Sequence, residues 1–128
     1  MKCYVAGHDR KECKKIAEAV QLAGHEITSR WLDEPMYPTV TYSPEEKLRI
    51  AVMDIKDVLA SDVLLNLAVD RYLPGGKFVE IGAMLGQGKP VISIGSKVEN
   101  MLMYHPLVHV VSDIHDALVA LSGIASGD

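Results

Sequence analysis

The residue with the clearest chemical potential is Glu80, which follows Gly75 and Gly76 at the expected start of a helix. A helix N-terminus favours negative charge by about 0.3–1 kcal/mol, so we expect this first-turn carboxylate to be ionised. An ionised, positioned carboxylate can attack an anomeric carbon, because cleavage of a glycosidic bond passes through an oxocarbenium-like state. The two glycines would let a sugar or a phosphate approach the backbone closely. A first-turn glutamate on a solvated face is the ordinary alternative, and spacing alone leaves both interpretations open.

Two further candidates are Asp54 and Arg10. Asp54 lies at the edge of the apolar face of an expected helix, where a solvated carboxylate is the ordinary alternative to a functional one. Arg10 and Lys11 follow a glycine turn and open a helix, where backbone N–H groups and the helix dipole attract anions. A phosphate site and ordinary surface basic residues explain this pair equally well, and the loop lacks the glycine spacing of a Walker motif.

Metal and thiol chemistry are not indicated. His105 and His109 are four residues apart, but Pro106 and the β-branched residues that follow argue against a helix, and no third ligand stands out. We therefore expect no metal site and no cofactor. Cys3 and Cys13 are expected to be small buried apolar side chains rather than nucleophiles.

These side chains must be held by elements that alternate between strand and helix. We expect strands at 2–6, 25–31, 63–69, 91–94 and 108–111, and helices at 10–22, 44–60, 77–87 and 113–121. Ser43 and Glu46 have the spacing of a capping box, and Pro44 suits the first turn of the helix that follows. The apolar face of that helix is expected to consist of Leu48, Ala51, Ile55, Val58 and Leu59.

Two other segments carry specific expectations. Gly82 and Gly86 are four residues apart in the helix expected at 77–87, which could let this helix pack closely on a neighbour. The segment 32–42 contains two prolines and no clean periodicity, so we interpret it as an ordered loop. Its length favours a functional role over a simple connection.

Five strands alternating with helices predict an α/β fold: a single-domain, doubly wound, five-stranded parallel sheet with right-handed crossovers. The flavodoxin/Rossmann-like order 2-1-3-4-5 is the simplest arrangement. The chain contains no repeat and no linker, so residues 1–128 are interpreted as one domain. In such sheets ligands bind beyond the carboxyl ends of the strands, at the switch point between the first and third strands. The segments at that point are 7–11, 70–76 and 77–80.

Composition and charge narrow the class of ligand. A chain of 128 residues with a net charge of −4 suits one domain and argues against binding a nucleic-acid polymer, which would need a basic stripe. No run approaches the ~20 apolar residues of a membrane-spanning helix, and the first residues lack the apolar region of a signal peptide. Two cysteines make no disulfide framework. We therefore expect a cytoplasmic protein, with no membrane partner, that acts on a small molecule or serves as an interaction module.

Several segments match a known pattern when they are taken together. They are Tyr4-Val5-Ala6-Gly7, Asp54 eight residues before Asp62, and Gly76-Lys77-Phe78-Val79-Glu80-Ile81-Gly82-Ala83 followed by Gly88-Lys89-Pro90-Val91. In this order and spacing they resemble the nucleoside 2-deoxyribosyltransferase family, which includes the 2′-deoxynucleoside 5′-phosphate N-hydrolases. The resemblance covers the chain from the first strand to Asn100.

The resemblance implies an enzyme that cleaves the N-glycosidic bond of a 2′-deoxynucleoside or its 5′-monophosphate. Glu80 would be the nucleophile that forms a deoxyribosyl ester, which water or a second base would then resolve. Asp54 would lie near the reacting sugar and base, and Tyr4 would match the floor of the pocket; both are assigned to the catalytic group. Substrate contacts are expected at Gly7, His8, Arg10, Asp70, Gly75, Gly76, Asn100 and Met101.

The resemblance also carries implications for assembly and for the substrate. Asn100 resembles an asparagine that a neighbouring subunit inserts into the site, which implies a homodimer or a larger homo-oligomer. Arg10 matches a phosphate-contacting arginine of the monophosphate hydrolases, which favours a nucleotide substrate.

Two positions depart from the family pattern. Six residues before the nucleophile the family carries an aspartate or a serine, whereas this chain has Pro74, and Asp70 is a candidate replacement. His8 stands where the hydrolases have a serine. Base stacking could instead come from the aromatic residues of the long loop, namely Trp31, Tyr37 and Tyr42.

Three other interpretations compete with this one. Pro74-Gly75-Gly76 matches the first half of a phosphoribohydrolase motif, although the Gly-Thr pair is absent and Glu80 comes two residues early. A non-catalytic nucleotide-sensing module on the same fold is favoured by Pro74. A phosphoacceptor receiver domain fits least, because it needs an acidic pair after the first strand and a lysine after the fifth.

Overall fold

The protein forms a five-stranded parallel sheet covered by helices on both faces. The computed structural model describes residues 1–35, 41–68, 75–95 and 100–127. Within these ranges the strand order is β2-β1-β3-β4-β5. The strands are β1 (Lys2–Ala6), β2 (Glu26–Ile27), β3 (Val63–Leu67), β4 (Val91–Ile94) and β5 (Val108–Val111). The doubly wound fold class and the strand order expected from the sequence are both confirmed.

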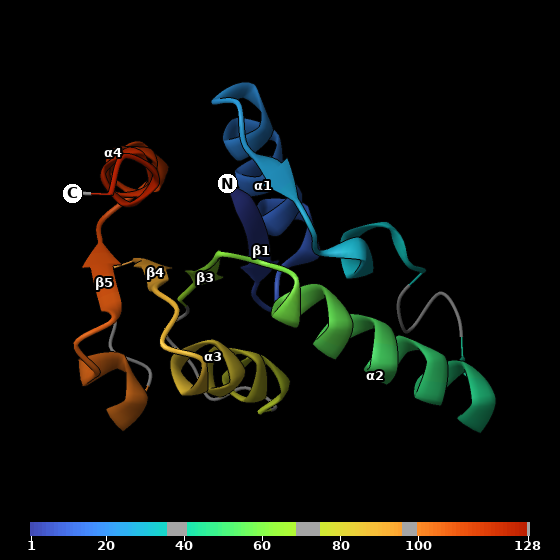
Figure 1. The fold of residues 1–128 in the computed structure, drawn as a ribbon. Helices are drawn as coiled ribbons and strands as arrows, with labels where there is room; N and C mark the ends of the chain where they lie inside the picture. The colour runs from blue at the N-terminus through green and yellow to red at the C-terminus, as the bar shows by residue number, and fades with distance from the viewer. Residues whose placement is uncertain (36–40, 69–74, 96–99, 128) are drawn as a thin grey trace.

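The helices are arranged in two layers. They are α1 (Arg10–Leu22), α2 (Pro44–Leu59), α3 (Gly76–Gly86) and α4 (Ile114–Ala125), with the short 3-10 helices η1 (Arg30–Asp33) and η2 (Met101–Tyr104). Figure 1 shows α1 and α4 on one face of the sheet and α2 and α3 on the other. Side-chain caps fix where the helices begin. Asp9 and Asp113 accept from the backbone N–H three residues on, and Ser43 with Glu46 forms the expected capping box.

Alternation along β1 divides the core between the two faces. Cys3 and Val5 pack into the cluster beneath α1 and α4, whereas Tyr4 and Ala6 pack into the cluster beneath α2 and α3. Successive side chains of a strand point to opposite faces, so this register is what directs Tyr4 toward α3. All four side chains are buried, as the sequence pattern predicted for Cys3.

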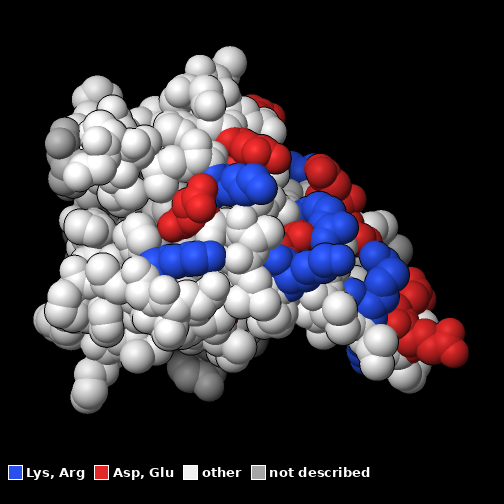
Figure 2. Space-filling view, in the orientation of Figure 1, with Lys and Arg blue, Asp and Glu red and all other residues white. Residues whose placement is uncertain are grey.

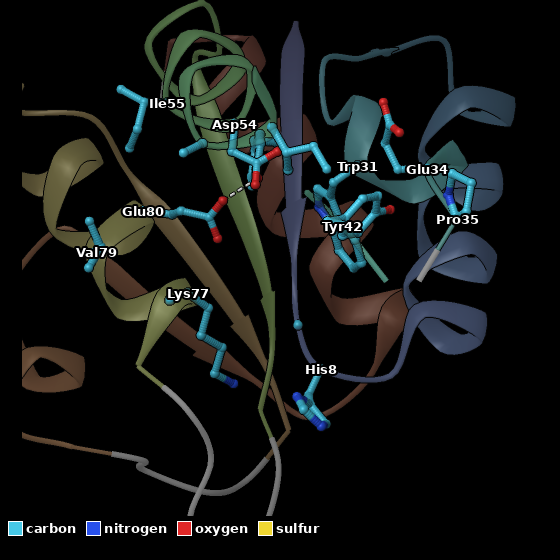
Figure 3. Close-up of a pocket in the computed structure, with 15 residues that line it drawn as sticks. His8, Trp31, Glu34, Pro35, Tyr42, Asp54, Ile55, Lys77, Val79 and Glu80 are labelled. Carbon is cyan, nitrogen blue, oxygen red and sulfur yellow. Dashed lines mark hydrogen bonds between the residues drawn. The ribbon is translucent and has the colours of Figure 1, made fainter. Parts of the chain in front are cut away.

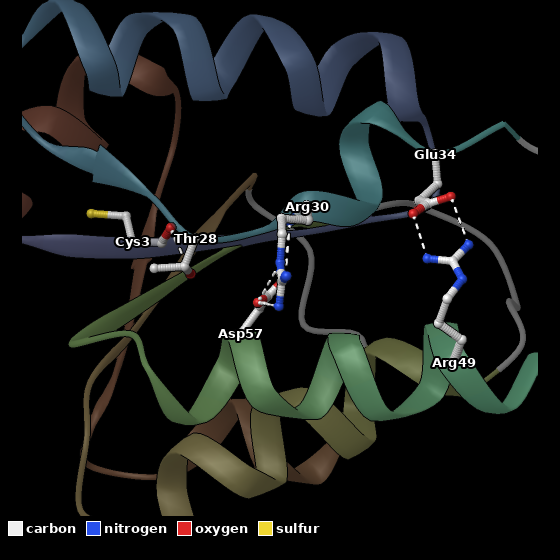
Figure 4. Close-up of polar contacts among 6 residues, drawn as sticks. All are labelled: Cys3, Thr28, Arg30, Glu34, Arg49 and Asp57. Carbon is white, nitrogen blue, oxygen red and sulfur yellow. Dashed lines mark hydrogen bonds and ion pairs between the residues drawn. The ribbon is translucent and has the colours of Figure 1, made fainter.

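The second strand is shorter than the segment 25–31 expected from the sequence. It ends at Ile27 because side chains replace its backbone pairing with β1. The Thr28 hydroxyl donates to the Cys3 carbonyl at 3.2 Å (Figure 4), and the Val5 N–H donates to Ser29 Oγ at 3.1 Å. Trp31 Nε1 donates to the Val5 carbonyl at 2.8 Å. These bonds satisfy the edge of β1 and free the chain to turn into η1.

Ion pairs join α2 to the η1 segment. Figure 2 shows charged side chains from the centre of this face to the tip of α2, while the outer part formed by α4 and β5 carries none in this view. In Figure 4 the Arg30 guanidinium contacts both oxygens of the buried Asp57 carboxylate, with Nη2 2.6 Å from Oδ1. Arg49 contacts both oxygens of Glu34, at 3.0 and 3.2 Å. The two pairs fix α2 beside η1.

The apolar face expected on α2 is not the face that is buried. Of the five residues predicted for it only Val58 is buried, and the helix turns Met53 and Asp57 inward instead. Its outward side carries an apolar stripe, made of Leu48, Val52, Ile55 and Leu59, whose members are 38% to 68% exposed. Because α2 extends past the end of the sheet (Figure 1), no described strand covers this side.

The close packing expected at Gly82 and Gly86 is likewise not found within the described chain. A Cβ atom built at either position would meet no described atom within 4 Å. Gly7 is the glycine on which packing depends. A Cβ there would lie 2.6 Å from Cys13 Sγ and 3.1 Å from Leu67 Cβ, so the turn from β1 into α1 has room only for hydrogen.

We predict that Gly7→Ala destabilises the fold by about 1–3 kcal/mol, because the new methyl group overlaps a buried sulfur atom. Denaturant unfolding of the variant measures this change. Adding Cys13→Ala should recover part of the loss, because it removes the overlapping atom. The control is Gly123→Ala in α4, where a Cβ meets nothing within 4 Å and should be neutral or stabilising. Equal effects of Gly7→Ala and Gly123→Ala would contradict the packing argument.

Candidate active site

A pocket of about 520 Å³ opens beyond the carboxyl end of β1, between η1, α2 and α3 (Figure 3). It lies where the strand order reverses, which is where ligands bind in open parallel sheets. It is lined by Tyr4, Gly7, His8, Trp31, Glu34, Pro35, Tyr42, Ile50, Ala51, Asp54, Ile55, Gly76, Lys77, Val79 and Glu80. Its volume is that of a small-molecule site.

A hydrogen bond between Tyr4 and Glu80 forms the floor of the pocket. Tyr4 stands in the middle of the sheet with no exposed surface, and its hydroxyl donates to Glu80 Oε2. Figure 3 shows this bond to the Glu80 carboxylate, which reaches from α3 toward β1. Burial, and then the adjacent Glu80 carboxylate, raise the pKa of Tyr4, so the phenol remains a donor. The tyrosine thus holds one carboxylate oxygen in a fixed place.

The protonation of Glu80 differs from the expectation. The helix begins at Gly76, one residue earlier than predicted, so Glu80 lies beyond the first turn, where the helix dipole acts most strongly. The pKa of this carboxyl is raised from 4.5 to about 7. Burial is the main cause; the Tyr4 hydrogen bond opposes the increase, and the Asp54 charge adds to it. The carboxyl is therefore not held fully ionised by the helix N-terminus, because desolvation outweighs the dipole.

Asp54 is the second carboxyl group of the pocket and comes from the facing helix α2. Burial raises its pKa to about 6, and the charges of Asp57 and Glu34 add to the increase. Its Oδ1 atom is buried and has no hydrogen-bond partner among the described residues. A buried oxygen without a partner costs free energy, so this position favours either a proton or a ligand donor at that atom. Two carboxyl groups with pKa values near neutrality can exchange a proton at ordinary pH.

The opposite wall of the pocket is aromatic and includes one fixed charge. Trp31 and Tyr42 lie close together in Figure 3, and the bond from Trp31 Nε1 to β1 fixes the indole ring. Glu34 stands at the rim, and the paired Arg49 guanidinium lowers its pKa. A planar base could stack on this wall while its sugar faces Glu80.

The structure brings together most of the residues that the sequence singled out. Tyr4, Gly7, His8, Asp54, Gly76 and Glu80 line the pocket, and Gly75 is the N-cap of α3. Asp70, Pro74 and Tyr37 lie outside the described residues. Arg10 is directed elsewhere, since its Nε donates to the Leu32 carbonyl at 2.8 Å and it does not line the pocket.

Asn100 and Met101 are not part of the pocket of their own chain. Asn100 caps η2, where its Oδ1 accepts from the Leu102 N–H at 2.8 Å, and Met101 is 87% exposed beside it. Two charged pocket residues, Lys77 and Glu34, were not singled out individually, although they lie in the segments 77–80 and 32–42 that the sequence analysis associated with the site. Lys77 stands one helical turn before Glu80, a spacing that places both on one side of a helix and could have identified it.

Neither a metal-binding cluster nor a membrane-spanning helix occurs among the described residues. No group of three or more His, Cys, Asp or Glu side chains among them is arranged to hold a metal ion. Among the described helices, none has the length and apolar character needed to cross a membrane.

Several solved structures share this α/β fold. No family model and no curated protein match the chain in sequence. A 2-deoxyribosyltransferase from the psychrotolerant bacterium Bacillus psychrosaccharolyticus matches with a TM-score of 0.71 and 24% identity, over 92% of this chain and 90% of its own. A conserved protein from Enterococcus faecalis V583 matches with a TM-score of 0.72 and 18% identity, over 97% and 98%. The CMP N-glycosidase of Clostridium botulinum matches with a TM-score of 0.61 and 18% identity, over 95% and 98%. The fold expected from the family resemblance is thereby confirmed.

The raised pKa of Glu80 predicts a pH-dependent stability effect. In the unfolded chain this carboxyl ionises at its usual 4.5, whereas in the fold it holds its proton to about 7. The contribution of this carboxyl to the free energy of unfolding therefore falls as the pH rises from 4.5 through 7 and changes no further above 7. Glu80→Gln mimics the protonated group and keeps an acceptor for Tyr4, so it should stabilise the protein at pH 8 by up to about 3 kcal/mol and have little effect at pH 4.

Chemical denaturation at the two pH values measures this difference. Glu18→Gln, at an exposed position on α1, is the matched control and should change stability little at either pH. A Glu80→Gln variant that is no more stable than the wild type at pH 8 would show that burial does not penalise the charge.

Proposed function

We propose that this protein is a nucleoside 2-deoxyribosyltransferase-like enzyme that cleaves the N-glycosidic bond of a 2′-deoxynucleoside or its 5′-monophosphate. The observation that carries the proposal is the presence of two half-buried carboxyl groups with raised pKa values, Glu80 and Asp54, in one pocket with an aromatic wall. The fold shared with a 2-deoxyribosyltransferase and a CMP N-glycosidase supports the same reaction class.

The first step forms a covalent ester. An ionised oxygen of Glu80 bonds to C1′ of the sugar as the C1′–N bond breaks, and the electron pair of that bond passes to the base. Asp54 in its protonated form gives its proton to the departing base, because a neutral base leaves more easily than an anion. The Tyr4 hydroxyl keeps the attacking carboxylate aimed at the sugar.

The second step releases the sugar from Glu80. The ionised Asp54 takes a proton from water, whose oxygen bonds to C1′ while the ester bond to Glu80 breaks. Two successive displacements at C1′ give overall retention of configuration. A second base in place of water would regenerate a nucleoside, so hydrolysis and transfer share the same intermediate.

The proposal includes a homodimer or larger homo-oligomer. The pocket is open on the side lined by Ala51, Ile55 and Val79, which are exposed to solvent. Ile55 also belongs to the apolar stripe of α2. Asn100 does not line the pocket of its own chain, and it stands beside exposed apolar side chains of η2. A neighbouring subunit that covers the stripe would close the open side and could supply Asn100.

We predict that Glu80→Ala lowers the release of free base by about 10³-fold or more, because the ester can no longer form. Asp54→Asn should lower it by about 10²–10⁴-fold, because the base then leaves without a proton. The measurement is chromatography of free base from a panel of deoxynucleosides and their monophosphates, with and without an acceptor base. Glu18→Ala is the control and should leave turnover unchanged. Release of free base by Glu80→Ala at the wild-type rate would contradict the assignment of Glu80 as the nucleophile.

The pH profile of the same reaction tests the shared proton. One carboxyl must be ionised and the other protonated, so kcat/KM should be highest between about 6 and about 7 and fall on both sides. Asp54→Asn removes one of the two titrating groups and a charge that raises the pKa of Glu80, so the remaining activity should keep a single limb, the ionisation of Glu80, and that limb should lie below about 7. An unmoved limb would contradict coupling between the two groups.

The assembly is tested by two variants of equal exposure. Val52→Arg places a charge in the α2 stripe at a residue that is 60% exposed, whereas Val119→Arg alters a residue of α4 that is 61% exposed. We predict that light scattering shows a dimer or larger assembly for the wild type and for Val119→Arg, and a monomer for Val52→Arg. Mixing Glu80→Ala with Asn100→Ala should restore activity, because a mixed dimer contains one intact site. An active wild-type monomer would overturn this part of the proposal.

A further inference from the structure

The outer side of β5 offers backbone groups to a further strand. β5 is the last strand in the sheet order, and Figure 1 shows it at the outer side of the sheet. The carbonyls of Leu107 and Val111 accept from the β4 side, at 3.0 and 2.8 Å. Because backbone groups alternate in direction along a strand, the residues between them, Val108 and Val110, direct their N–H and C=O groups away from β4.

Most of these outward groups have no partner within the described chain. The Val108 N–H is used locally, since it donates to the His105 carbonyl at 2.9 Å. No hydrogen bond among the described residues engages the Val108 carbonyl, either backbone group of Val110, or the Ser112 N–H. Val110 is 45% exposed, and the neighbouring His109 is exposed as well. An accessible row of such groups is a template for another strand.

The part of the chain that forms this side of the sheet lacks the charges that commonly prevent strand pairing. All 13 lysine and arginine residues of the protein precede residue 100. In the segment 101–127 the acidic residues are Asp113 and Asp116, both at the start of α4. Figure 2 likewise shows no charged side chain on the outer part formed by α4 and β5 in this view. Lysine and proline are among the residues that block pairing at an outer strand, and β5 contains neither.

We propose that β5 pairs with β5 of a second copy of this chain, antiparallel and about a two-fold axis at Val110. In this register each Val110 donates to and accepts from Val110 of the other copy. Each Ser112 N–H donates to the Val108 carbonyl of the other copy. The backbone groups that lack partners in one copy are thus complementary to the same groups in another, as a two-fold contact requires.

Apolar side chains accompany this ladder. Val110 would face its own copy across the axis, and no like charges would stand opposite each other. The η2 helix contacts β5 and exposes Leu102 by 44% and Tyr104 by 77%. Because β5 has four residues, the contact is small, and interfaces below about 1,200 Å² are weak. We therefore expect it to form at high protein concentration, in contrast to the stable assembly proposed for the α2 stripe.

The contact is independent of the proposed reaction and of the α2 stripe. No residue of β5 lines the pocket. Figure 1 shows β5 and α2 at opposite sides of the molecule, so a second copy at β5 would leave α2 accessible. Loss of one contact therefore does not entail loss of the other.

The register is tested by cross-linking between identical cysteines. In the proposed pair the two Val110 Cα atoms lie about 5.5 Å apart, within the range of a disulfide. The two copies of His109 are offset by two residues and lie about 8 Å apart, beyond that range. Under mild oxidation Val110→Cys should form a covalent dimer at least about 10-fold faster than the control His109→Cys. The native Cys3 and Cys13 have no exposed surface and do not compete. Equal rates for the two variants would overturn the register.

Light scattering of Val52→Arg protein tests the same contact without a new cysteine and without the α2 stripe. We expect the mass of a monomer in dilute solution and a rise toward that of a dimer near about 1 mM. Adding Val110→Lys should abolish the rise, because two charges would face each other across the axis. Adding Leu22→Lys, at a residue of α1 that is 90% exposed, should preserve it.

A mass that stays at the monomer value at every concentration would overturn the contact, because β5 would then be unpaired or would take a strand from a different protein. A rise that survives Val110→Lys would also overturn it, because the association would then lie elsewhere on the surface. Neither outcome bears on the proposed cleavage, which is measured by release of free base.

Discussion

The hydrogen bond from Tyr4 to Glu80 is the constraint on which the site depends. It joins a fully buried residue at the centre of the sheet to a helix that follows a different strand, so it exists only when β1, β3 and α3 are correctly packed. The alternation that buries Tyr4 on the α3 side also sends Cys3 and Val5 into the other core. The same strand register therefore determines both the packing of the core and the orientation of the Glu80 carboxylate.

Burial raises the pKa values of the two carboxyl groups in the pocket and costs stability at the same residues. Glu80 and Asp54 both have raised pKa values, chiefly because α2 and α3 withdraw them from water. The Asp54 charge adds to the increase at Glu80, and the charges of Asp57 and Glu34 add to the increase at Asp54. Elsewhere on α2, Asp57 accepts from the Arg30 guanidinium and Arg49 contacts Glu34. The helix that carries Asp54 is thus held beside η1 by ion pairs that involve neither Asp54 nor Glu80.

Local signals predicted the fold well, and long-range contacts account for the rest. The bounds of β1, α1, β4 and β5 matched because periodicity and caps are local in sequence. The second strand was overestimated because Ser29 and Trp31 bond to β1, which no local pattern reveals. The sequence singled out Tyr4, Asp54 and Glu80, which the fold brings into one pocket. The protonation of Glu80 was mispredicted because desolvation depends on elements far away in the chain.

The side-chain bonds that end β2 also protect an edge of the sheet. Strand edges with free backbone groups can pair with other chains, which is a route to aggregation. Here β2 offers only two residues as an edge, and beyond it the Val5 N–H and carbonyl of β1 are occupied by Ser29 and Trp31. An incoming strand would find no continuous ladder to extend on this side. The indole that forms a wall of the pocket therefore also helps to keep this edge of the sheet closed to other chains.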